Sequence, residues 1–250
     1  RYALVILTVA VWCSYSLAAP ALAAESSAGA CQLIPAGNQA GSLEGWKSYH
    51  QDGAKTADVW SLDAQGVLHC QGQPLGYLIT EKNYDDFVLE LDWRWPPGKE
   101  PGKGGVLIRT TGADKIWPKS LEAQINAGDA GDFWGLDGYQ LDGPADRKTS
   151  LEHPQFGKLT NVKKSAAVEK PAGQWNHYKI VADGPVGTLE INGQTVNRAT
   201  DCETAPGKIV LTAEGSPIEY RNVQIWALLS AERLPRSDRP RDGQLRALPQ

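Results

Sequence analysis

The sequence predicts an all-β protein, a sandwich or barrel built from antiparallel strands. Short runs in which apolar and polar residues alternate dominate the chain, as in half-buried strands. Turn-forming residues are frequent, with 26 glycines and 16 prolines among 250 residues, and convincing amphipathic helices are scarce. Many short strands separated by turns are typical of antiparallel sandwiches and barrels.

The first clear strand is the stretch DFVLELDWRW at 86–95. Every second residue there is apolar and shares one face: Phe87, Leu89, Leu91, Trp93 and Trp95. A second strand, GGVLIRTT at 104–111, places Arg109 on the same face as Leu107.

The stretch IWPKSLEAQINAGDAGDFWG, residues 116–135, combines a strand with a turn rich in glycine and aspartate. If Leu121, Ala123 and Ile125 face the core, the opposite face carries three polar side chains: Glu122, Gln124 and Asn126. That face is either an ordinary solvated surface or the floor of a site for a polar ligand.

The second half of the chain adds further strands. WNHYKIVAD at 175–183 alternates, and TLEINGQTV at 188–196 predicts a hairpin because Asn192-Gly193 suits a type I′ turn. KIVLTAEG at 208–215 and PIEYRNVQIWAL at 217–228 supply two more strands.

Between the two halves, the region from Gly138 to Val168 is poorer in pattern and predicts long loops. No internal repeat is visible.

The formal net charge of −4 argues against a surface for nucleic acid. No stretch after the N-terminal segment is apolar and long enough to span a bilayer, so no transmembrane segment is expected there.

The N-terminus has the pattern of a secretory signal peptide at 1–24. Arg1 precedes an apolar run from Ala3 to Val11, and Ala21-Leu22-Ala23 offers a small-x-small cleavage site. We therefore expect a secreted or periplasmic protein; an uncleaved membrane anchor is the alternative.

One folded domain is expected at 45–228. It follows an N-terminal extension at 25–44 and precedes an Arg/Pro-rich tail at 229–250, whose composition predicts disorder.

Cys31, Cys70 and Cys202 remain once the signal peptide is removed. An exported protein meets oxidising conditions, so one disulfide is expected, with the pair left open. The spacing of these cysteines does not match a zinc site or a thiol nucleophile motif.

Several blocks occur in one order along the chain: GYLITEKNYDDFVLELDWRW, GGVLIR, IWPKSLEAQI, GDAGDFW, GQWNHYKI, INGQTVNRAT and GKIVLTAEGSPIEYRNVQI. Together they closely resemble a family of exported bacterial proteins, formerly a domain of unknown function, now associated with 3-keto-disaccharide (3-keto-glycoside) hydrolysis. The resemblance runs from about Gly45 to Leu228. It implies a concanavalin A-like jelly-roll sandwich of two antiparallel sheets, with a ligand site on a concave sheet.

One block departs from that family. Many members have a Gly-Asn-Ser-Gly type sequence before the Val-Leu-Leu-Arg strand, whereas this chain has Pro101-Gly102-Lys103-Gly104-Gly105. If the missing Asn and Ser contact the ligand in relatives, specificity or activity differs here.

The chemistry that the resemblance implies begins at C2 of a 3-keto-glucosyl unit, where the ketone acidifies the hydrogen. A base removes that proton, and the C1 substituent leaves by β-elimination, with or without later addition of water. The reaction needs one base and an electropositive group near the ketone oxygen. It does not need the opposed carboxylate pair of ordinary glycosidases.

Glu122 is the first candidate for an essential residue, as the base or as a ligand to a divalent ion, and Gln124 on the same face suits sugar hydroxyls. Their alternation alone favours a solvated face, whereas the resemblance favours a site. Arg109 is a catalytic candidate for stabilising the enolate, although an Arg at a strand end is also a common surface residue or salt-bridge partner.

Asp132 is a third catalytic candidate, with turn capping as the alternative. Trp117 and Trp134 are candidate stacking platforms for sugar rings. His177 follows Trp175-Asn176 in a family block, so it is a substrate-binding candidate or an ordinary hydrogen-bonded strand histidine.

Other residues are assigned to structure. Five tryptophans are expected in the core: Trp46, Trp60, Trp93, Trp175 and Trp226. Glu214 and Arg221 are expected to form a buried ion pair.

No cofactor is certain from the sequence. A divalent metal ion such as Ca²⁺ would suit the oxygen-rich set Glu122, Asp129 and Asp132, but no short ligand motif is present.

The sequence therefore predicts an exported glycoside hydrolase or lyase acting on 3-keto-glycosides. A non-catalytic, lectin-like carbohydrate-binding module of the same fold is the alternative. A conventional endoglucanase is disfavoured, because Glu90-Leu91-Asp92 begins an acidic motif that no second Glu completes.

Overall fold

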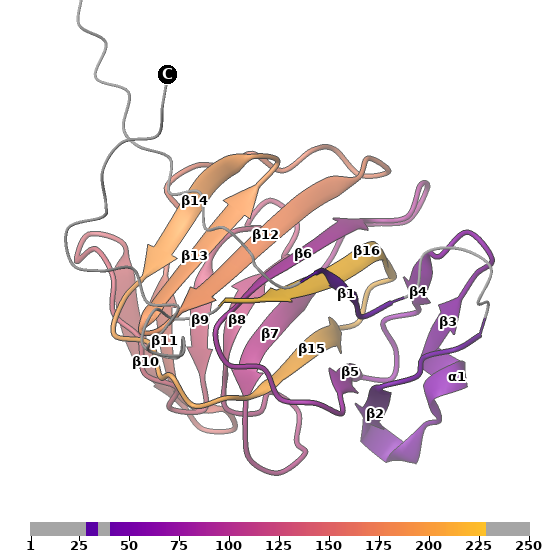
Figure 1. Ribbon diagram of the computed structural model, residues 1–250, viewed down its shortest axis with the longest axis horizontal. Coiled ribbons are helices and arrows are strands. Elements are labelled where there is room, and N and C mark those ends of the chain that lie inside the picture. Colours follow the sequence, from indigo (N-terminus) through magenta and orange to yellow (C-terminus); the bar gives the residue numbers. More distant parts are fainter. Residues whose placement is uncertain (1–28, 35–40, 229–250) are drawn as a thin grey trace, which may run out of the picture.

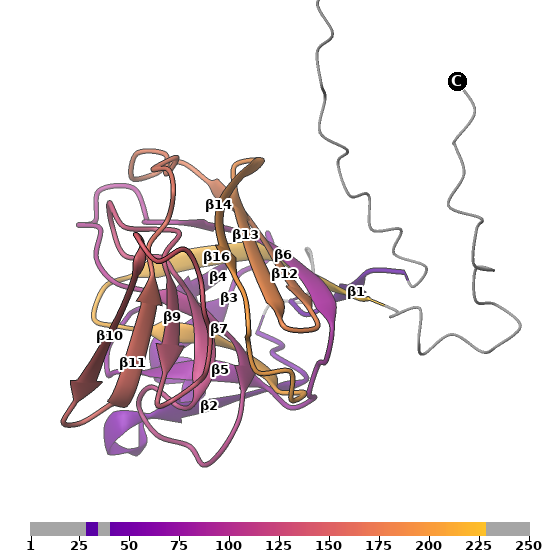
Figure 2. The ribbon, with the colours of Figure 1, turned by 90° about the vertical axis from the view of Figure 1, so that its left-hand side faces the viewer.

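The computed structural model describes residues 29–34 and 41–228. The predicted signal peptide at 1–24 and the predicted tail at 229–250 lie outside the described residues. Two antiparallel sheets of eight strands each form two layers, which Figures 1 and 2 show from two directions. The predicted sandwich is confirmed.

One layer, the back sheet, has the strand order β14-β13-β12-β6-β16-β4-β3, and β1 also pairs with β16. Its strands are β1 (Cys31–Gln32), β3 (Trp60–Leu62), β4 (Leu68–Cys70), β6 (Phe87–Arg94), β12 (Asn176–Asp183), β13 (Val186–Ile191), β14 (Gln194–Ala199) and β16 (Ile218–Ala227).

The other layer, the front sheet, has the order β10-β11-β9-β8-β7-β15-β5-β2. Its strands are β2 (Trp46–His50), β5 (Gly76–Thr80), β7 (Gly105–Thr110), β8 (Ser120–Gln124), β9 (Phe133–Leu136), β10 (Lys148–His153), β11 (Gly157–Val162) and β15 (Lys208–Ala213). Two short helices, η1 (Gln51–Gly53) and α1 (Thr56–Val59), follow β2.

The main core lies between the sheets and follows the predicted alternation. The five alternating apolar residues of the 86–95 stretch, Phe87 to Trp95, are buried in it, and so are Leu121, Ala123 and Ile125 of the β8 region. The polar residues between them therefore point away from the core.

A second apolar cluster covers the opposite side of the front sheet. Its buried members are Tyr77, Ile79, Leu107, Leu136 and Val210, with Tyr49, Trp117, Trp134 and Leu159 packed against them. We call this the outer-face cluster. Apolar side chains thus lie on both faces of the front sheet, and a polar residue surrounded by the outer-face cluster is shielded from water.

The hairpin at 188–196 forms as predicted between β13 and β14. Asn192 and Gly193 both have positive φ values, 52° and 81°, as a type I′ turn requires.

The expectation of long loops from Gly138 to Val168 is wrong in part. Strands β10 and β11 form an antiparallel hairpin there and close one edge of the front sheet. Their exposed residues gave little apolar alternation, because this edge covers only a small part of the core.

Two tryptophans expected in the core lie elsewhere. Trp46, Trp60 and Trp93 are buried, whereas Trp175 and Trp226 are only partly buried. The ring of Trp175 lies between the guanidinium groups of Arg94 and Arg221, which are 4.4 and 4.1 Å from its centroid. Cation–π contacts thus stabilise the Trp175 ring outside the core.

The expected disulfide is not formed. Cys31 is exposed, Cys70 and Cys202 are buried, and all three are free thiols. Residues before position 45, expected to be an extension, are part of the folded domain. Strand β1 pairs with β16, and Ile34 is buried in the main core.

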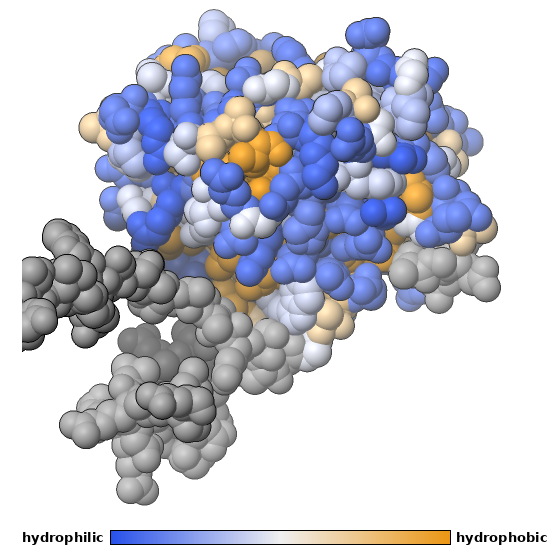
Figure 3. Space-filling model, turned by 90° about the horizontal axis from the view of Figure 1, so that it is seen from above, coloured by the Kyte–Doolittle hydropathy of each residue, from blue (hydrophilic) through white to orange (hydrophobic). Residues whose placement is uncertain are grey.

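Among the described residues, no helix has both the length and the apolar character needed to cross a membrane. The surface seen from above is mostly hydrophilic, with small scattered apolar patches (Figure 3).

Candidate active site

Glu122 lies at the centre of the candidate site, on the outer face of the front sheet. In the register of the sheet it faces Leu107 of β7 on one side and Trp134 of β9 on the other. Only 7% of Glu122 is exposed, although it points away from the main core. The sequence pattern predicted its face correctly, and the outer-face cluster explains its burial.

Gly105, the first residue of β7, provides room for this carboxylate. A Cβ atom at position 105 would lie 2.5 Å from Oε1 of Glu122, closer than any unbonded contact allows. The backbone of Gly105 is fixed from the other side by Thr212, whose Oγ1 accepts the Gly105 N–H at 2.7 Å. Strands β7, β8 and β15 thus jointly fix the position of the Glu122 side chain.

Burial raises the pKa of Glu122 well above its usual value of 4.5, and the negative charges of Glu214 and Asp132 raise it further. Burial also raises the pKa of Glu214, while the Thr212 hydroxyl and the charge of Lys103 act in the opposite direction. A carboxylate in such surroundings is a stronger base than one in water.

Sequence reasoning missed the relation between Glu214 and Glu122. The predicted ion pair between Glu214 and Arg221 is wrong, because Arg221 lies on the back sheet and its Nε donates to Asp92 at 3.0 Å. The only sequence signal for this proximity was the position of Glu214 directly after the strand β15. In the structure β15 pairs with β7, and β7 pairs with the strand that carries Glu122.

A pocket of 450 Å³ lies at Trp134, the neighbour of Glu122 across the β8–β9 pair, and we call it the site pocket; Glu122 itself is not one of its lining residues. The pocket is lined by residues of the β8–β9 region and of β10 and β11, including Gln124, Asp132, Trp134, Thr149, Asn161 and Lys163. Three residues predicted for the site, Gln124, Asp132 and Trp134, therefore meet here. Its volume is typical of small-molecule sites.

Trp134, which lines the site pocket, has an unused hydrogen-bond donor. Its indole Nε1 is buried and has no hydrogen-bond partner among the described residues. A buried donor without a partner is costly, so a ligand oxygen that accepts this N–H would relieve the cost.

Asp132 is held firmly in place. Its carboxylate accepts the backbone N–H of Lys164 at 2.9 Å and the Nδ2 group of Asn161 at 3.2 Å. These bonds fix the turn around the pocket, so Asp132 lines the site and also holds its wall.

The acidic set expected for a metal ion does not converge. Asp129 has a side chain that is 72% exposed and pairs with Nζ of Lys164 at 3.0 Å. Across the described part of the chain, no group of three or more His, Cys, Asp or Glu side chains is arranged to hold a metal ion.

Trp117 lies next to the site without lining the site pocket. It packs against the outer-face cluster, 6.2 Å from the ring of Phe156, and its φ of 60° is rare for a bulky residue.

Arg109 does not share the face of Leu107, which corrects the sequence-based expectation. It has a φ of 51°, and the pairing of β7 with β15 shifts register beside it. Its guanidinium is buried, pairs with Asp86 at 2.9 Å and donates to the carbonyl oxygens of Gly184 and Glu203. A bulge that strand alternation does not reveal turns the side chain toward the end of the back sheet.

His177 is also not brought to the site pocket. It lies on β12 of the back sheet, and its Nδ1 is 2.9 Å from Asp92. The hydrogen bond to this carboxylate raises the pKa of His177 above its usual 6.5.

The sequence pattern of a known domain family, the 3-keto-alpha-glucoside-1,2-lyase-like domain, matches residues 36–226. The chain belongs to this family. A comparison with curated protein sequences found no match.

Several solved structures share the fold of this chain. A candidate glycosyl hydrolase from Parabacteroides distasonis is 16% identical, with a TM-score of 0.56 over 81% of this chain and 95% of that one. Carbohydrate binding module CBM66 from Bacillus subtilis is 16% identical, with a TM-score of 0.53 over 77% of this chain and 100% of that one. A β-glucanase from Bacillus licheniformis is 13% identical, with a TM-score of 0.52 over 80% of this chain and 99% of that one. These likenesses confirm the concanavalin A-like jelly-roll fold.

Proposed function

We propose that this 3-keto-glucoside lyase-like protein cleaves 3-keto-glycosides and that Glu122 is its base. The observation that carries the proposal is a buried carboxylate with a raised pKa beside a pocket that offers polar groups. The family to which the chain belongs supports the substrate class.

In this reaction the Glu122 carboxylate takes the proton from C2, and the electron pair of the C–H bond forms an enolate with the C3 ketone. The enolate then collapses, C1 and C2 become doubly bonded, and the C1–O bond breaks. The leaving oxygen takes back the proton from the Glu122 carboxylic acid. Addition of water to the resulting enone completes a net hydrolysis.

The enolate oxygen requires donors that are already in place. We assign this role to the Trp134 N–H, which has no partner, and to Lys163, which lines the same pocket. The ammonium group of Lys163 forms no ion pair with another residue of the described chain. Arg109 is not assigned this role, because its guanidinium is bound to Asp86.

The test is product analysis with 3-keto-trehalose, 3-keto-lactose and their unoxidised parents. The wild type should release 3-keto-glucose or its enone from the keto sugars only. Glu122→Gln should lower the rate by about 10²- to 10⁴-fold, the usual contribution of a general base. Glu90→Gln is a matched control, since Glu90 is a strand glutamate on the back sheet, 3.9 Å from His177.

Two outcomes would contradict the proposal. Equal activity of wild type and Glu122→Gln would remove Glu122 from the reaction. Sugar binding by the folded wild type without turnover of any keto sugar would instead identify a non-catalytic carbohydrate-binding module.

Export is a separate proposal that rests on the N-terminal sequence pattern alone. Expression with this segment in a bacterial host, followed by N-terminal sequencing of the secreted fraction, tests it. Cleavage near Ala23 is the expected result, and protein retained uncleaved in the membrane would contradict it.

A further inference from the structure

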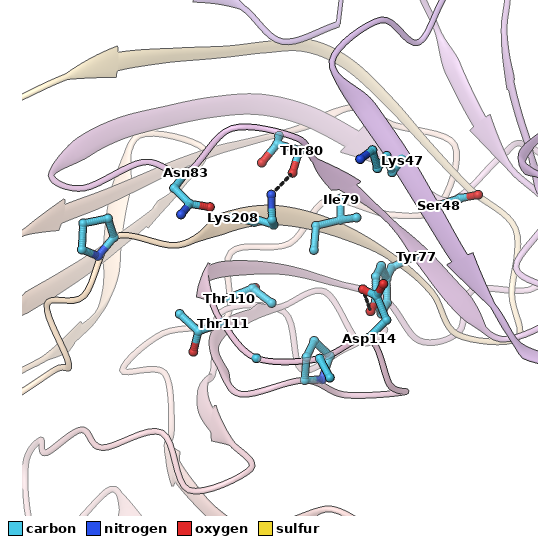
Figure 4. A pocket seen from close by; sticks show the side chains of 14 residues that line it. Lys47, Ser48, Tyr77, Ile79, Thr80, Asn83, Thr110, Thr111, Asp114 and Lys208 are labelled. Atoms are coloured by element: carbon cyan, nitrogen blue, oxygen red, sulfur yellow. Dashed lines mark hydrogen bonds between the residues drawn. The ribbon is translucent and has the colours of Figure 1, made fainter.

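A second pocket, of 490 Å³, lies on the front sheet away from Glu122 (Figure 4). It is formed by β2, β5, the end of β7 with the loop that follows it, and the start of β15. None of its lining residues lines the site pocket. We call it the distal pocket.

The two pockets share no lining residue, although Thr110 of the distal pocket lies on β7, the strand next to β8. From β8, which carries Glu122, the sheet runs through β7 and β15 to β5, which carries Ile79 of the distal pocket. Three strand spacings amount to about 14 Å. A ring packed against Ile79 in the distal pocket therefore lies three strands from Glu122 and contacts none of the residues that line the site pocket.

The distal pocket combines an apolar wall with hydrogen-bonding groups of both kinds. Ile79 and Tyr77 supply the apolar wall, and both belong to the outer-face cluster. The Asn83 amide both donates and accepts, and the Asp114 carboxylate accepts the Tyr77 hydroxyl at 3.0 Å. Figure 4 shows these groups around one hollow.

Thr110, which lines this pocket, has a hydroxyl group without a hydrogen-bond partner among the described residues. The residue is only 4% exposed, and its Oγ1 is buried. A hydroxyl both donates and accepts, so a hydroxyl group of a ligand would satisfy it.

The charges of the distal pocket favour a neutral ligand. Nζ of Lys208 already donates to the carbonyl oxygens of Thr80 and Glu81, at 3.0 and 2.7 Å. Nζ of Lys47 lies 3.5 Å from the Glu81 carboxylate. The carboxylate of Asp114 on the opposite wall would repel an anion.

We infer that the distal pocket binds an unoxidised, neutral sugar ring, separately from the reacting ring at Glu122. An apolar wall with convergent donors and acceptors suits a ring that has C–H faces and hydroxyl edges. The choice of a sugar over another polyol rests on the carbohydrate function proposed above.

The experiment is an ¹⁵N NMR titration of the full protein with trehalose, because each pocket has its own reporter. The backbone amide of Gly112 and the side-chain amide of Asn83 report the distal pocket, and the Trp134 indole reports the site pocket. Millimolar trehalose should shift the Gly112 and Asn83 signals in a saturable manner.

Two threonine variants form a matched pair on the same sheet. Thr110→Val removes the buried hydroxyl at nearly constant volume and should weaken binding at the Gly112 and Asn83 reporters about fivefold. Thr149→Val makes the same substitution at an exposed threonine of the site pocket and should leave those reporters unchanged. Asn83→Ala, read at Gly112, provides a second test if Thr110→Val does not fold.

The inference is overturned if trehalose moves neither Gly112 nor Asn83, or if Thr110→Val and Asn83→Ala bind as the wild type does. The proposed reaction fails by a different readout, since it requires turnover of keto sugars and loss of that turnover in Glu122→Gln. Trehalose binding at the distal pocket of Glu122→Gln should equal that of the wild type.

Discussion

The carboxylate of Glu122 occupies the space where any side chain at position 105 would begin. A Cβ atom there would be 2.5 Å from Oε1 and 3.1 Å from Cδ of Glu122. The position of the candidate base thus depends on a glycine in the neighbouring strand.

Gly105→Ala should displace the Glu122 carboxylate and lower turnover of 3-keto-trehalose at least tenfold, because small misplacements of catalytic groups are costly. Overpacking should also cost about 1–3 kcal/mol of stability. Gly104→Ala is the matched control, since its nearest contact would be the flexible Cδ1 of Ile218 at 3.3 Å. Full activity of a folded Gly105→Ala variant would contradict the assigned position of the base.

Glu122→Gln should stabilise the protein at neutral pH. The folded-state pKa of Glu122 is raised, so the wild type loses stability as the pH rises from about 4.5 through that pKa. Each tenfold change in the acid constant corresponds to about 1.4 kcal/mol, and the amide avoids this loss. Urea unfolding at pH 7 should show the gain, and the gain should vanish below pH 4.5. If the variant is instead less stable than the wild type at pH 7, the negative charge of Glu122 does not destabilise the folded protein.

Glu214→Gln should shift the pH dependence of the reaction. The Glu214 charge raises the pKa of Glu122, so its removal lowers that pKa and extends activity toward acidic pH. The acidic limb of kcat/KM against pH is the measurement. Glu90→Gln on the back sheet should leave the limb in place. A shift toward alkaline pH in Glu214→Gln would contradict the arrangement.

Arg109→Met should act on stability. The change leaves Asp86 without its buried partner, which typically costs 3–5 kcal/mol. Arg198→Met, on the exposed face of β14, is the control and should change stability little. Urea denaturation compares the two. If Arg109→Met instead keeps its stability and loses turnover, the catalytic role suggested by the sequence is restored.

His177→Gln should leave turnover unchanged and weaken the pH dependence of stability. The hydrogen bond to Asp92 raises the pKa of His177, so its contribution is complete below 6.5 and is lost as the pH rises through the folded-state pKa. The thermal midpoint as a function of pH measures this. His153→Gln, whose ring stacks on Phe156, is the comparison. Loss of turnover in His177→Gln would contradict its placement on the back sheet.

The two-sheet architecture follows from alternation, because a strand between a core and a surface must present two different faces. That rule placed Glu122 and Gln124 on the outer face and Leu121 in the core. Turn chemistry located the Asn192-Gly193 turn, since few residues other than Asn and Gly adopt two positive φ values in succession.

Alternation does not state which strands become neighbours. The sequence pattern predicts the strand of His177 as clearly as the strand of Glu122. Only the long-range pairing of β12 with β6 assigns His177 to the other sheet. Arg109 was misplaced for a local reason, because a single left-handed residue reverses the face of a strand end. The burial of Glu122 depends on residues as distant in sequence as Val210, which no local pattern reveals.

The order of strands has a consequence for how the molecule is made. The strand β15 lies between β7 and β5, and β16 lies between β6 and β4, so the last two strands of the fold join the two parts of each sheet. Until residues 208–227 emerge during synthesis, both sheets are divided and expose unpaired edges. Contacts between such distant segments form slowly. Thr212 and Glu214, which fix Gly105 and tune Glu122, also belong to this final segment. Docking of residues 208–227 therefore completes both sheets and the surroundings of Glu122 in one step.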